Sequence, residues 1–211
     1  MKNRARAGFS LLEFLIILSL IGSVAGVTLM MSRTSGSLTN QSQVTASLDQ
    51  QLHRTLDRIG KKLRYASLSS LLPASAAGSP TLTFQVPVDY SGGSVVLGPA
   101  QVIRWESAPG DTVDDLDNNG NGLVDEGRVV WLEDVSEPSR AIALSSSTAW
   151  GFDGETPNGV DDNGNGLIDE PGLSFELNGR TLTIRMTVQG VDDSGVIHSR
   201  SRKARVSLRN P

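Results

Sequence analysis

A long apolar run near the start of the chain is its most distinctive pattern. Residues 9–31 are 23 residues in which Glu13 is the only charged side chain. About 20 apolar residues in a helix are enough to cross the ~30 Å hydrocarbon core of a bilayer, so the run predicts a membrane-spanning helix. The preceding residues 1–8, MKNRARAG, carry three basic residues and no acid, which predicts a cytoplasmic N-terminus.

After residue 31 the apolar side chains recur mostly every three or four residues. This spacing predicts an amphipathic helix that continues from the span and buries one face on a sheet, and no proline occurs before Pro73. We expect helix from residue 9 to about residue 68, with the amphipathic half within residues 32–70. The apolar stripe consists of Leu38, Val44, Leu48, Leu52, Leu56, Ile59 and Leu63.

Short runs of β-forming residues, separated by turn segments, fill residues 71–211. Asn178-Gly179 between two such runs predicts a two-residue hairpin, and Asp193-Ser194-Gly195 predicts the next turn. The sequence therefore predicts an α+β fold, in which the amphipathic half of the helix packs on an antiparallel β-sheet head. The expected strands are residues 81–88, 101–107, 128–134, 140–145, 172–178, 180–189 and 196–209.

Composition narrows the chemistry. The 211 residues include no cysteine, which excludes disulfides, thiolate metal sites and a cysteine nucleophile, and the two histidines are too far apart in sequence for a local zinc motif. No G-x-S-x-G or H-E-x-x-H motif occurs, so we expect no enzyme. Aromatic residues make up only 5%, which disfavours a base-stacking surface and makes nucleic acid an unexpected partner.

Negative charge is concentrated in two windows, although the whole chain has a net charge of only −4. Residues 111–127 and 153–172 contain 12 of the 23 acidic residues and neither lysine nor arginine. Within them, residues 117–126 and 161–170 are near copies 44 residues apart that differ at two of ten positions, and a Val-Asp-Asp precedes each copy, with two extra residues in the first. Like charges this close repel one another, so a bound cation is the obvious way to neutralise them.

Each copy has oxygen-bearing side chains at alternate positions around a glycine, as a Ca²⁺ loop requires. We favour the register that both copies share, in which Val124 and Ile168 face inward. The ligands of the first loop are then Asp117, Asn119, Asn121, the Leu123 carbonyl, Asp125 and Glu126, and those of the second are Asp161, Asn163, Asn165, the Leu167 carbonyl, Asp169 and Glu170. A competing register follows the EF-hand pattern from Asp115 to Glu126 but puts Gly159 at the first ligand position of the second copy.

The two copies resemble the D-x-D-G-D-G repeats of thrombospondin type 3 domains and EF-hand loops, with asparagine in place of several aspartates. The resemblance implies two Ca²⁺ sites. Fewer carboxylates weaken binding, so we expect dissociation constants of about 10⁻⁴–10⁻³ M, as in extracellular modules. The alternative is a pair of Asn/Gly-rich turns that hydrogen-bond to themselves without a metal.

Residues 8–22, GFSLLEFLIILSLIG, resemble the class III signal of type IV pilins and type II secretion pseudopilins. The resemblance implies cleavage between Gly8 and Phe9 by a prepilin peptidase, N-methylation of Phe9, and a requirement for Glu13 in assembly. A carboxylate inside a span is costly and needs a partner. Glu13 therefore either snorkels at the interface or pairs with the new α-amine on Phe9 of a neighbouring subunit. Residues 56–66, LDRIGKKLRYA, resemble the corresponding segment of J-type pseudopilins.

Together these features predict a minor pseudopilin or pilin-like structural subunit of a type II secretion or type IV pilus filament. Such a subunit would be held in the inner membrane by one span, with residues 1–8 as its leader and its head in the periplasm. Its partners would be a prepilin peptidase and other pilin-like subunits. The alternative is a membrane-anchored, calcium-dependent adhesin or binding module that acts alone.

Overall fold

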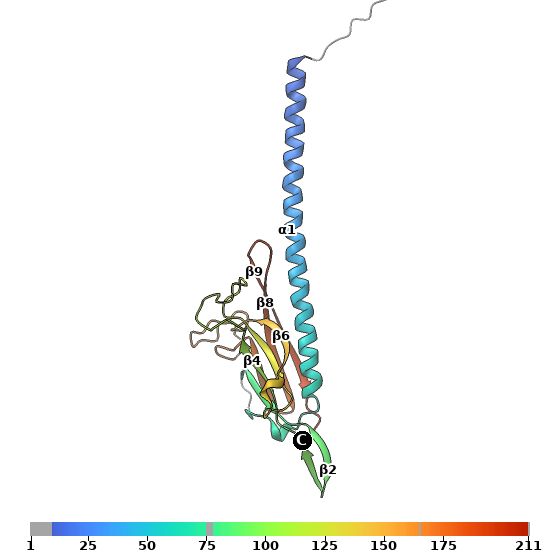
Figure 1. Cartoon of the computed structure of the whole chain (residues 1–211), viewed down its shortest axis with the longest axis vertical. Coiled ribbons are helices and arrows are strands. Elements are labelled where there is room, and N and C mark those ends of the chain that lie inside the picture. The colour runs from blue at the N-terminus through green and yellow to red at the C-terminus, as the bar shows by residue number, and fades with distance from the viewer. Residues whose placement is uncertain (1–9, 75–77, 165, 211) are drawn as a thin grey trace, which may run out of the picture. The chain divides into compact units, whose positions relative to one another are not determined.

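The computed structural model describes residues 10–74, 78–164 and 166–210, and its contacts divide the chain into two compact units, Met1–Ser42 and Gln43–Pro211 (Figure 1). The described part of the first unit is helical from Leu11 onwards, and the second unit contains the rest of that helix and every strand. The predicted α+β class is therefore confirmed. The leader, Phe9 and Asn165 lie outside the described residues.

Helix α1 (Leu11–Leu63) begins with a capping box. Ser10 Oγ accepts the N–H of Glu13 at 3.2 Å, and Glu13 Oε2 accepts the N–H of Ser10 at 2.9 Å. These bonds satisfy N–H groups that a helix leaves unpaired at its N-terminus. Leu11–Ser32 has a mean hydropathy of 2.4 and no buried residue, and it is the one segment of the described chain that is long and apolar enough to cross a membrane.

The helix ends at Leu63, about five residues before the predicted end. The backbone beyond it is used by the head instead: the Ser67 N–H donates to Gln85 O at 2.9 Å, and the Leu68 N–H donates to Asn210 O at 3.3 Å. A short 3₁₀ helix, η1 (Leu68–Ser70), follows. Amphipathic spacing could not reveal this end, because the competing hydrogen bonds come from distant residues.

Seven strands form one antiparallel sheet in the order β1-β4-β5-β6-β8-β7, with β9 on the other edge of β8. They are β1 (Thr81–Phe84), β4 (Gln101–Ser107), β5 (Gly127–Leu132), β6 (Ile142–Thr148), β7 (Leu173–Asn178), β8 (Thr181–Val191) and β9 (Ile197–Ser207). A separate hairpin consists of β2 (Pro87–Ser91) and β3 (Ser94–Leu97), and a second 3₁₀ helix, η2 (Pro138–Arg140), precedes β6.

Strand β8 organises the sheet because three strands pair with it. Strand β9 follows one edge along its whole length. On the other edge, β7 pairs from Thr181 to Met186, and β6 joins at Val188 through its last residue, Thr148. The end of β6 and the start of β7 therefore meet the same part of β8. Since Gly127 at the start of β5 pairs with Thr148, the β4–β5 and β6–β7 connections leave the sheet at neighbouring positions.

The apolar stripe of α1 forms the core together with the inner face of the sheet. Leu52, Ile59 and Leu63 are fully buried, and Leu48 and Leu56 are nearly so, which confirms this part of the predicted stripe. The head contributes to the same cluster Leu82, Phe84, Ile103, Val129, Trp131, Leu173, Phe175, Leu182, Ile184, Met186, Val188, Val206 and Leu208. Removing this apolar area from water is the main favourable contribution to folding of the second unit.

Most expected strands are present, and the differences have local causes. The expected strand 81–88 is wrong, because β1 ends at Phe84 and β2 begins a separate hairpin at Pro87. Both strands of that hairpin are largely exposed, so they lack the apolar alternation that marks a half-buried strand. The predicted β7–β8 hairpin is confirmed, with Gly179 (φ +59°) and Arg180 as its two loop residues.

Candidate metal centre

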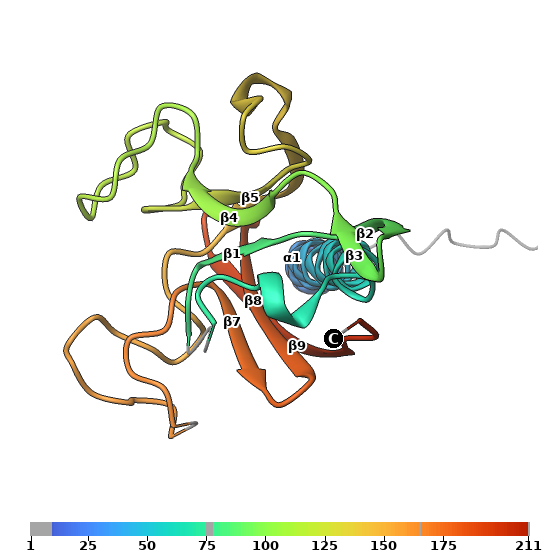
Figure 2. The ribbon, with the colours of Figure 1, turned by 90° about the horizontal axis from the view of Figure 1, so that it is seen from below.

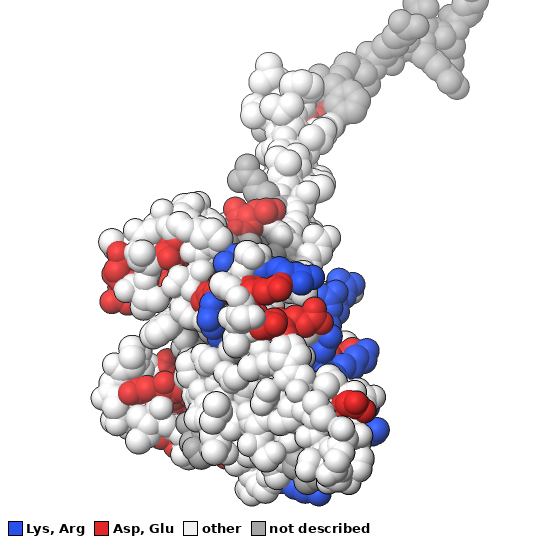
Figure 3. Space-filling view, turned by 60° about the horizontal axis from the view of Figure 1, so that its bottom comes forward, with Lys and Arg blue, Asp and Glu red and all other residues white. Residues whose placement is uncertain are grey.

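Two long connections carry the acidic windows. Loop 1 (residues 108–126) joins β4 to β5, and loop 2 (residues 149–172) joins β6 to β7. Figure 2 shows both loops projecting on the same side of the head, and in Figure 3 acidic side chains gather on two projections, apart from the main group of Lys and Arg. The bases of the loops touch: the rings of Trp105 and Trp150 stack edge to face with centroids 5.0 Å apart, and Trp105 Nε1 donates to Thr148 O at 3.3 Å.

The two loops repeat the same backbone bonds over residues 108–126 and 152–170. Ala108 N–H donates to Glu126 O at 3.0 Å, and 44 residues later Phe152 N–H donates to Glu170 O at 2.9 Å. Asp115 and Gly159 are equivalent and both left-handed, with φ of +64° and +79°. The offset of 44 holds throughout, so the expectation of two extra residues in the first copy is wrong. The two Val-Asp-Asp triplets, residues 113–115 and 160–162, are not at equivalent positions, because the residue equivalent to Asp115 is Gly159.

The backbone geometry favours the register that begins at Asp117. Asp117 Oδ1 accepts the N–H groups of Gly120 and Asn121 at 2.7 and 3.1 Å, and its Oδ2 accepts that of Gly122 at 2.8 Å. Asp161 does the same for Gly164 and Gly166, at 2.7 and 2.8 Å. Each aspartate therefore sits at the first position of a tight turn whose left-handed glycine comes five residues later.

The next asparagines continue this turn in loop 1. Asn119 Oδ1 accepts the N–H of Asn121 at 3.1 Å, and Asn121 Oδ1 accepts the N–H of Leu123 at 2.8 Å. Each of these side-chain oxygens therefore accepts a backbone N–H from the residue two positions later. Asn163 has the equivalent position in loop 2, whereas Asn165 lies outside the described residues.

The apolar residue of loop 1 that is buried is not the expected one. Leu123 is buried, whereas the side chains of Val124 and Ile168 are 42% and 61% exposed. The left-handed Gly122 lies against Val191 of β8 and turns the chain there, so that the next residue faces the sheet. The prediction that Val124 and Ile168 face inward is therefore wrong, and the ligand register stays a prediction.

Asp125 and Asp169 hold the start of each loop. The Asp125 carboxylate accepts the N–H groups of Asp114 and Asp115 at 2.8–3.2 Å, and Asp169 accepts those of Asn158 and Gly159 at 2.9–3.1 Å. Both aspartates have positive φ. The carboxylates of these two predicted ligands therefore close the loops by accepting backbone N–H groups from the start of each loop.

Loop 1 contains a buried pair of carboxylates, Glu126 and Asp111. Glu126 Oε1 accepts the side-chain amides of Asn119 and Asn121 at 2.7 and 2.6 Å. Asp111 Oδ1 accepts the Asn118 N–H, and its Oδ2 accepts the Glu126 N–H, both at 3.1 Å. Sequence reasoning missed Asp111, and the signal that could have revealed it is its acidic equivalent 44 residues later, Glu155.

The pKa values of the two carboxyl groups are shifted in opposite directions. Burial and the neighbouring Glu126 carboxylate raise the pKa of Asp111. Burial also acts to raise the pKa of Glu126, but hydrogen bonds from the two asparagine amides outweigh it and lower that pKa. Glu126 is therefore held as an anion beside a carboxyl that ionises less readily.

Loop 2 has the equivalent pair with different surroundings. Glu155 Oε1 accepts the Asn163 N–H at 3.1 Å, and Glu170 is buried. Arg185 Nε of β8 lies 3.8 Å from Glu170 Oε1, and Arg185 also donates to Glu176 at 2.8 Å. Loop 2 therefore has a guanidinium beside its buried glutamate.

In the outer turn of each loop an asparagine amide donates to an aspartate, but the two residue types occupy opposite positions in the two loops. In loop 1 Asn118 Nδ2 donates to Asp114 Oδ1 at 2.8 Å, and in loop 2 Asn158 Nδ2 donates to Asp162 Oδ2 at 2.9 Å. Asp114 is equivalent to Asn158, and Asn118 to Asp162, so each loop keeps one acid–amide pair with the roles reversed. One of the two differences between the copies is thereby compensated.

The donor set suits a hard cation because it consists of oxygen alone. Among the described residues, no three histidine, aspartate or glutamate side chains come together as a metal-binding group.

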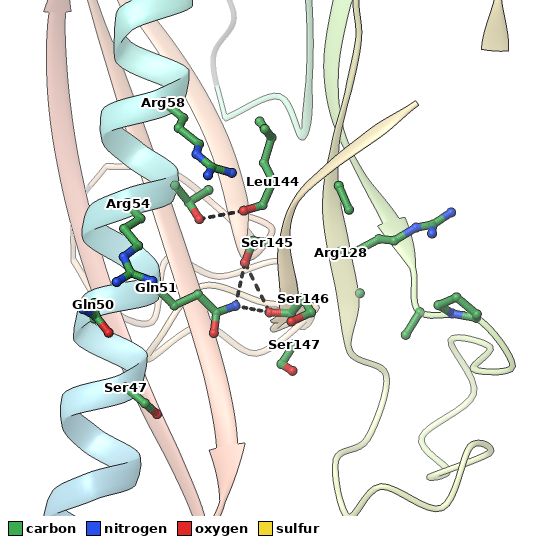
Figure 4. Close-up of a pocket in the computed structure, with 15 residues that line it drawn as sticks. Ser47, Gln50, Gln51, Arg54, Arg58, Arg128, Leu144, Ser145, Ser146 and Ser147 are labelled. Carbon is green, nitrogen blue, oxygen red and sulfur yellow. Dashed lines mark hydrogen bonds between the residues drawn. The ribbon is translucent and has the colours of Figure 1, made fainter. Parts of the chain in front are cut away.

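A polar pocket of about 660 Å³ lies beside the base of loop 1, between α1 and β6 (Figure 4). Gln51 Nε2 donates to Ser145 Oγ at 2.8 Å across it, and also contacts Ser146 O. Its lining includes Arg54, Arg58 and Arg128 and, among these described residues, no carboxylate or histidine. The pocket therefore lacks an acid–base pair, and its charge suits anionic groups.

Comparison of the chain with models of known families, with curated proteins and with solved structures found no match.

Proposed function

We propose that the chain is a pilin-like structural subunit, a minor pseudopilin of a type II secretion filament or a minor type IV pilin. Leu11–Ser32 anchors it in the inner membrane, and the head lies in the periplasm. Ca²⁺ bound by loops 1 and 2 stabilises the head. The observation that carries the proposal is the single carboxylate, Glu13, at the start of a span that is otherwise uncharged.

Glu13 has two candidate roles, capping of the helix and pairing with a neighbouring subunit. Its Oε2 completes the capping box with Ser10, whereas its Oε1 accepts no hydrogen bond from the described residues. Cleavage between Gly8 and Phe9 would create a positive α-amine on Phe9, which is one residue before Ser10 and four residues before Glu13 in the sequence. A carboxylate in an apolar setting gains most from such a charged partner. We therefore assign Glu13 to pairing with the Phe9 amine of a neighbouring subunit.

Three substitutions distinguish charge pairing from capping. Glutamine is accepted at this position of a capping box, so Glu13→Gln keeps the cap and removes the charge. Ser10→Ala weakens the cap by about 1 kcal/mol and keeps the charge. We expect Glu13→Gln and Glu13→Ala to reduce recovered filaments by roughly tenfold or more, because breaking a buried ion pair costs several kcal/mol. Ser10→Ala should assemble nearly as well as the wild type.

The assay is recovery of sheared filaments from cells that express the other subunits, with total subunit measured in the same cells. Normal assembly of Glu13→Gln together with failure of Glu13→Ala would show that Glu13 acts as a cap and would contradict the pairing.

The loops supply the second part of the proposal. Asp117, Asn119, Asn121, Glu126 and their equivalents in loop 2 would hold Ca²⁺, which would supply positive charge to an acidic pair of loops and stiffen them. Two features support this: the ligand-like turn repeats 44 residues later, and buried carboxylate oxygens in both loops, Glu126 Oε2 and Glu155 Oε2, accept no hydrogen bond from the described residues.

The alternative function is a calcium-dependent adhesin anchored by the same span. Both loop tips are exposed and project on the same side of the head, which favours it, since exposed loops are accessible to a partner. An adhesin that acts alone would keep its surface binding in Glu13→Ala cells, whereas a filament subunit would lose it together with the filament.

A further inference from the structure

We infer that the two cation sites are unequal, and that the tighter one lies in loop 1 and is built on the buried carboxylates of Asp111 and Glu126. The inference rests on the proposed calcium role of the loops. Its ligand is a hard divalent cation, with Ca²⁺ as the probe.

Burial and charge single out this pair. Asp111 and Glu126 are 5% and 1% exposed, and no ion pair within the described chain joins either of them to a lysine or arginine. Two neighbouring buried carboxylates are unfavourable when both are ionised, because desolvation and mutual repulsion act together. Glu126 Oε2 is buried and accepts no hydrogen bond from the described residues. A divalent cation at this position would neutralise both carboxylates and give Glu126 Oε2 a partner.

The neighbouring amides can complete the site. Asn119 and Asn121 both approach Glu126 Oε1, at 2.7 and 2.6 Å. Rotation of each carboxamide by 180° would exchange its nitrogen and oxygen, at the cost of the bonds that the Asn119 and Asn121 oxygens accept from the N–H groups of Asn121 and Leu123. A cation held by Glu126 would therefore have two amide oxygens within reach. Together with Asp111 they provide both carboxylates and amides, and Ca²⁺ accepts such mixed oxygen sets completed by water.

Loop 2 has the same plan but a weaker site, because Arg185 lies beside its buried glutamate. The guanidinium 3.8 Å from Glu170 already supplies positive charge there and repels a second cation. The partner carboxylate, Glu155, is only half-buried, whereas Asp111 is buried. Both differences lower the free energy gained when a cation replaces water in loop 2.

Calorimetric titration of the full chain in detergent with CaCl₂ tests the inference. The wild type should show a tighter and a weaker class of sites. Asp111→Asn and Glu126→Gln should weaken the tighter class by roughly tenfold or more, since carboxylate number sets Ca²⁺ affinity. Glu155→Gln should change only the weaker class. Asp114→Asn is the matched control: it removes the same charge from an exposed position of loop 1 that contacts Asn118, and it should leave the tighter class unchanged.

Arg185 provides an independent arm. Arg185→Gln should strengthen the weaker class several-fold, and Arg185→Lys, which keeps the charge, should not. Near-ultraviolet circular dichroism of each variant, which reports the tryptophans at the loop bases, verifies the fold before titration.

The outcomes separate this inference from the proposed function. Two classes of sites with the tighter one unchanged in both Asp111→Asn and Glu126→Gln would overturn the inference and leave the calcium role intact. Loss of the tighter class in Glu155→Gln would also overturn it. Absence of any saturable heat in the wild type would overturn the calcium role itself. The role of Glu13 in filament assembly is tested separately by the shearing assay.

Discussion

Two glycines let the long loops rejoin the sheet. A Cβ at Gly127, the first residue of β5, would overlap the Trp105 ring and the Glu106 carbonyl oxygen. A Cβ at Gly172, just before β7, would overlap the Ala149 carbonyl oxygen. Neither glycine has a left-handed φ, so both are needed for close approach rather than for backbone freedom. The absence of a Cβ at Gly127 and Gly172 therefore allows the bases of the loops to pack closely.

Gly127→Ala should lower the free energy of unfolding of the head by about 1–3 kcal/mol, the usual cost of overpacking a filled site. The Trp105 ring must move, and its contact with Trp150 should weaken. Denaturant titration of the full chain in detergent, followed by tryptophan fluorescence, measures the change.

Gly60→Ala is the control for this substitution. Its Cβ would meet only Val206 Cγ2 at 3.4 Å, and alanine is the better helix former by up to about 1 kcal/mol. Its stability should therefore equal or exceed that of the wild type. Equal stability of Gly127→Ala and Gly60→Ala would show that the Trp105 contact is not tight.

At the scale of elements, the β8–β9 hairpin supports both the sheet and loop 1. Val191 at the end of β8 lies against Gly122, and the turn that follows is closed by Asp192. Asp192 Oδ1 accepts the N–H groups of Ser194 and Val196 at 2.9 and 3.0 Å, and its Oδ2 lies 2.9 Å from His198 Nε2 of β9. One carboxylate thus joins the turn to the strand after it.

The stability of this hairpin should depend on pH. Contacts with His198, then Ser194 and Val196, hold the pKa of Asp192 well below its usual range. A carboxyl whose pKa is lower in the folded state stabilises the fold above its unfolded pKa of about 4, and this contribution is lost as the pH falls towards the folded value. Asp192→Asn should therefore be less stable than the wild type at pH 7, and the difference should shrink below about pH 4.

Denaturation curves recorded between neutral and strongly acidic pH test this expectation. The adjacent, exposed Asp193→Asn serves as control and should behave as the wild type throughout. A wild-type-to-Asp192→Asn difference that stays constant with pH would argue against the carboxylate as its source.

At the scale of the whole molecule, charge and hydrophobicity are divided along the chain. Residues 1–8 carry only basic charge, residues 9–31 carry one acid, and the head carries the two acidic loops. Loss of residues 1–8 would change the net charge from −4 to −7. Cleavage after Gly8 would thus leave an acidic chain whose new α-amine is four residues before Glu13 in the sequence.

We expect mass spectrometry of the chain from cells with an active prepilin peptidase to find Phe9 as the first residue, carrying a methyl group. Gly8→Val should remain uncut, and so should the wild type in cells without the peptidase. A wild-type chain that still begins at Met1 beside an active enzyme would contradict the proposed processing.

The apolar span, the buried stripe of α1 and the 44-residue repeat could be predicted from sequence because each depends on neighbours along the chain. Periodicity reveals which face of a helix is apolar, and duplication reveals which loop residues share a role. The hairpin at residues 87–97 was missed because its exposed strands have no apolar alternation to detect.

Only the tertiary structure decided what surrounds the buried glutamates. Asp111 approaches Glu126 because β4 and β5 pair at the base of loop 1, and Arg185 approaches Glu170 because β8 lies beside the end of loop 2. The repeat makes the two loops look equivalent, and the sheet makes them different. Sequence therefore determined where the duplicated acidic loops lie along the chain, whereas strand pairing determined which charges surround each buried glutamate, because electrostatic energy depends on distance in space.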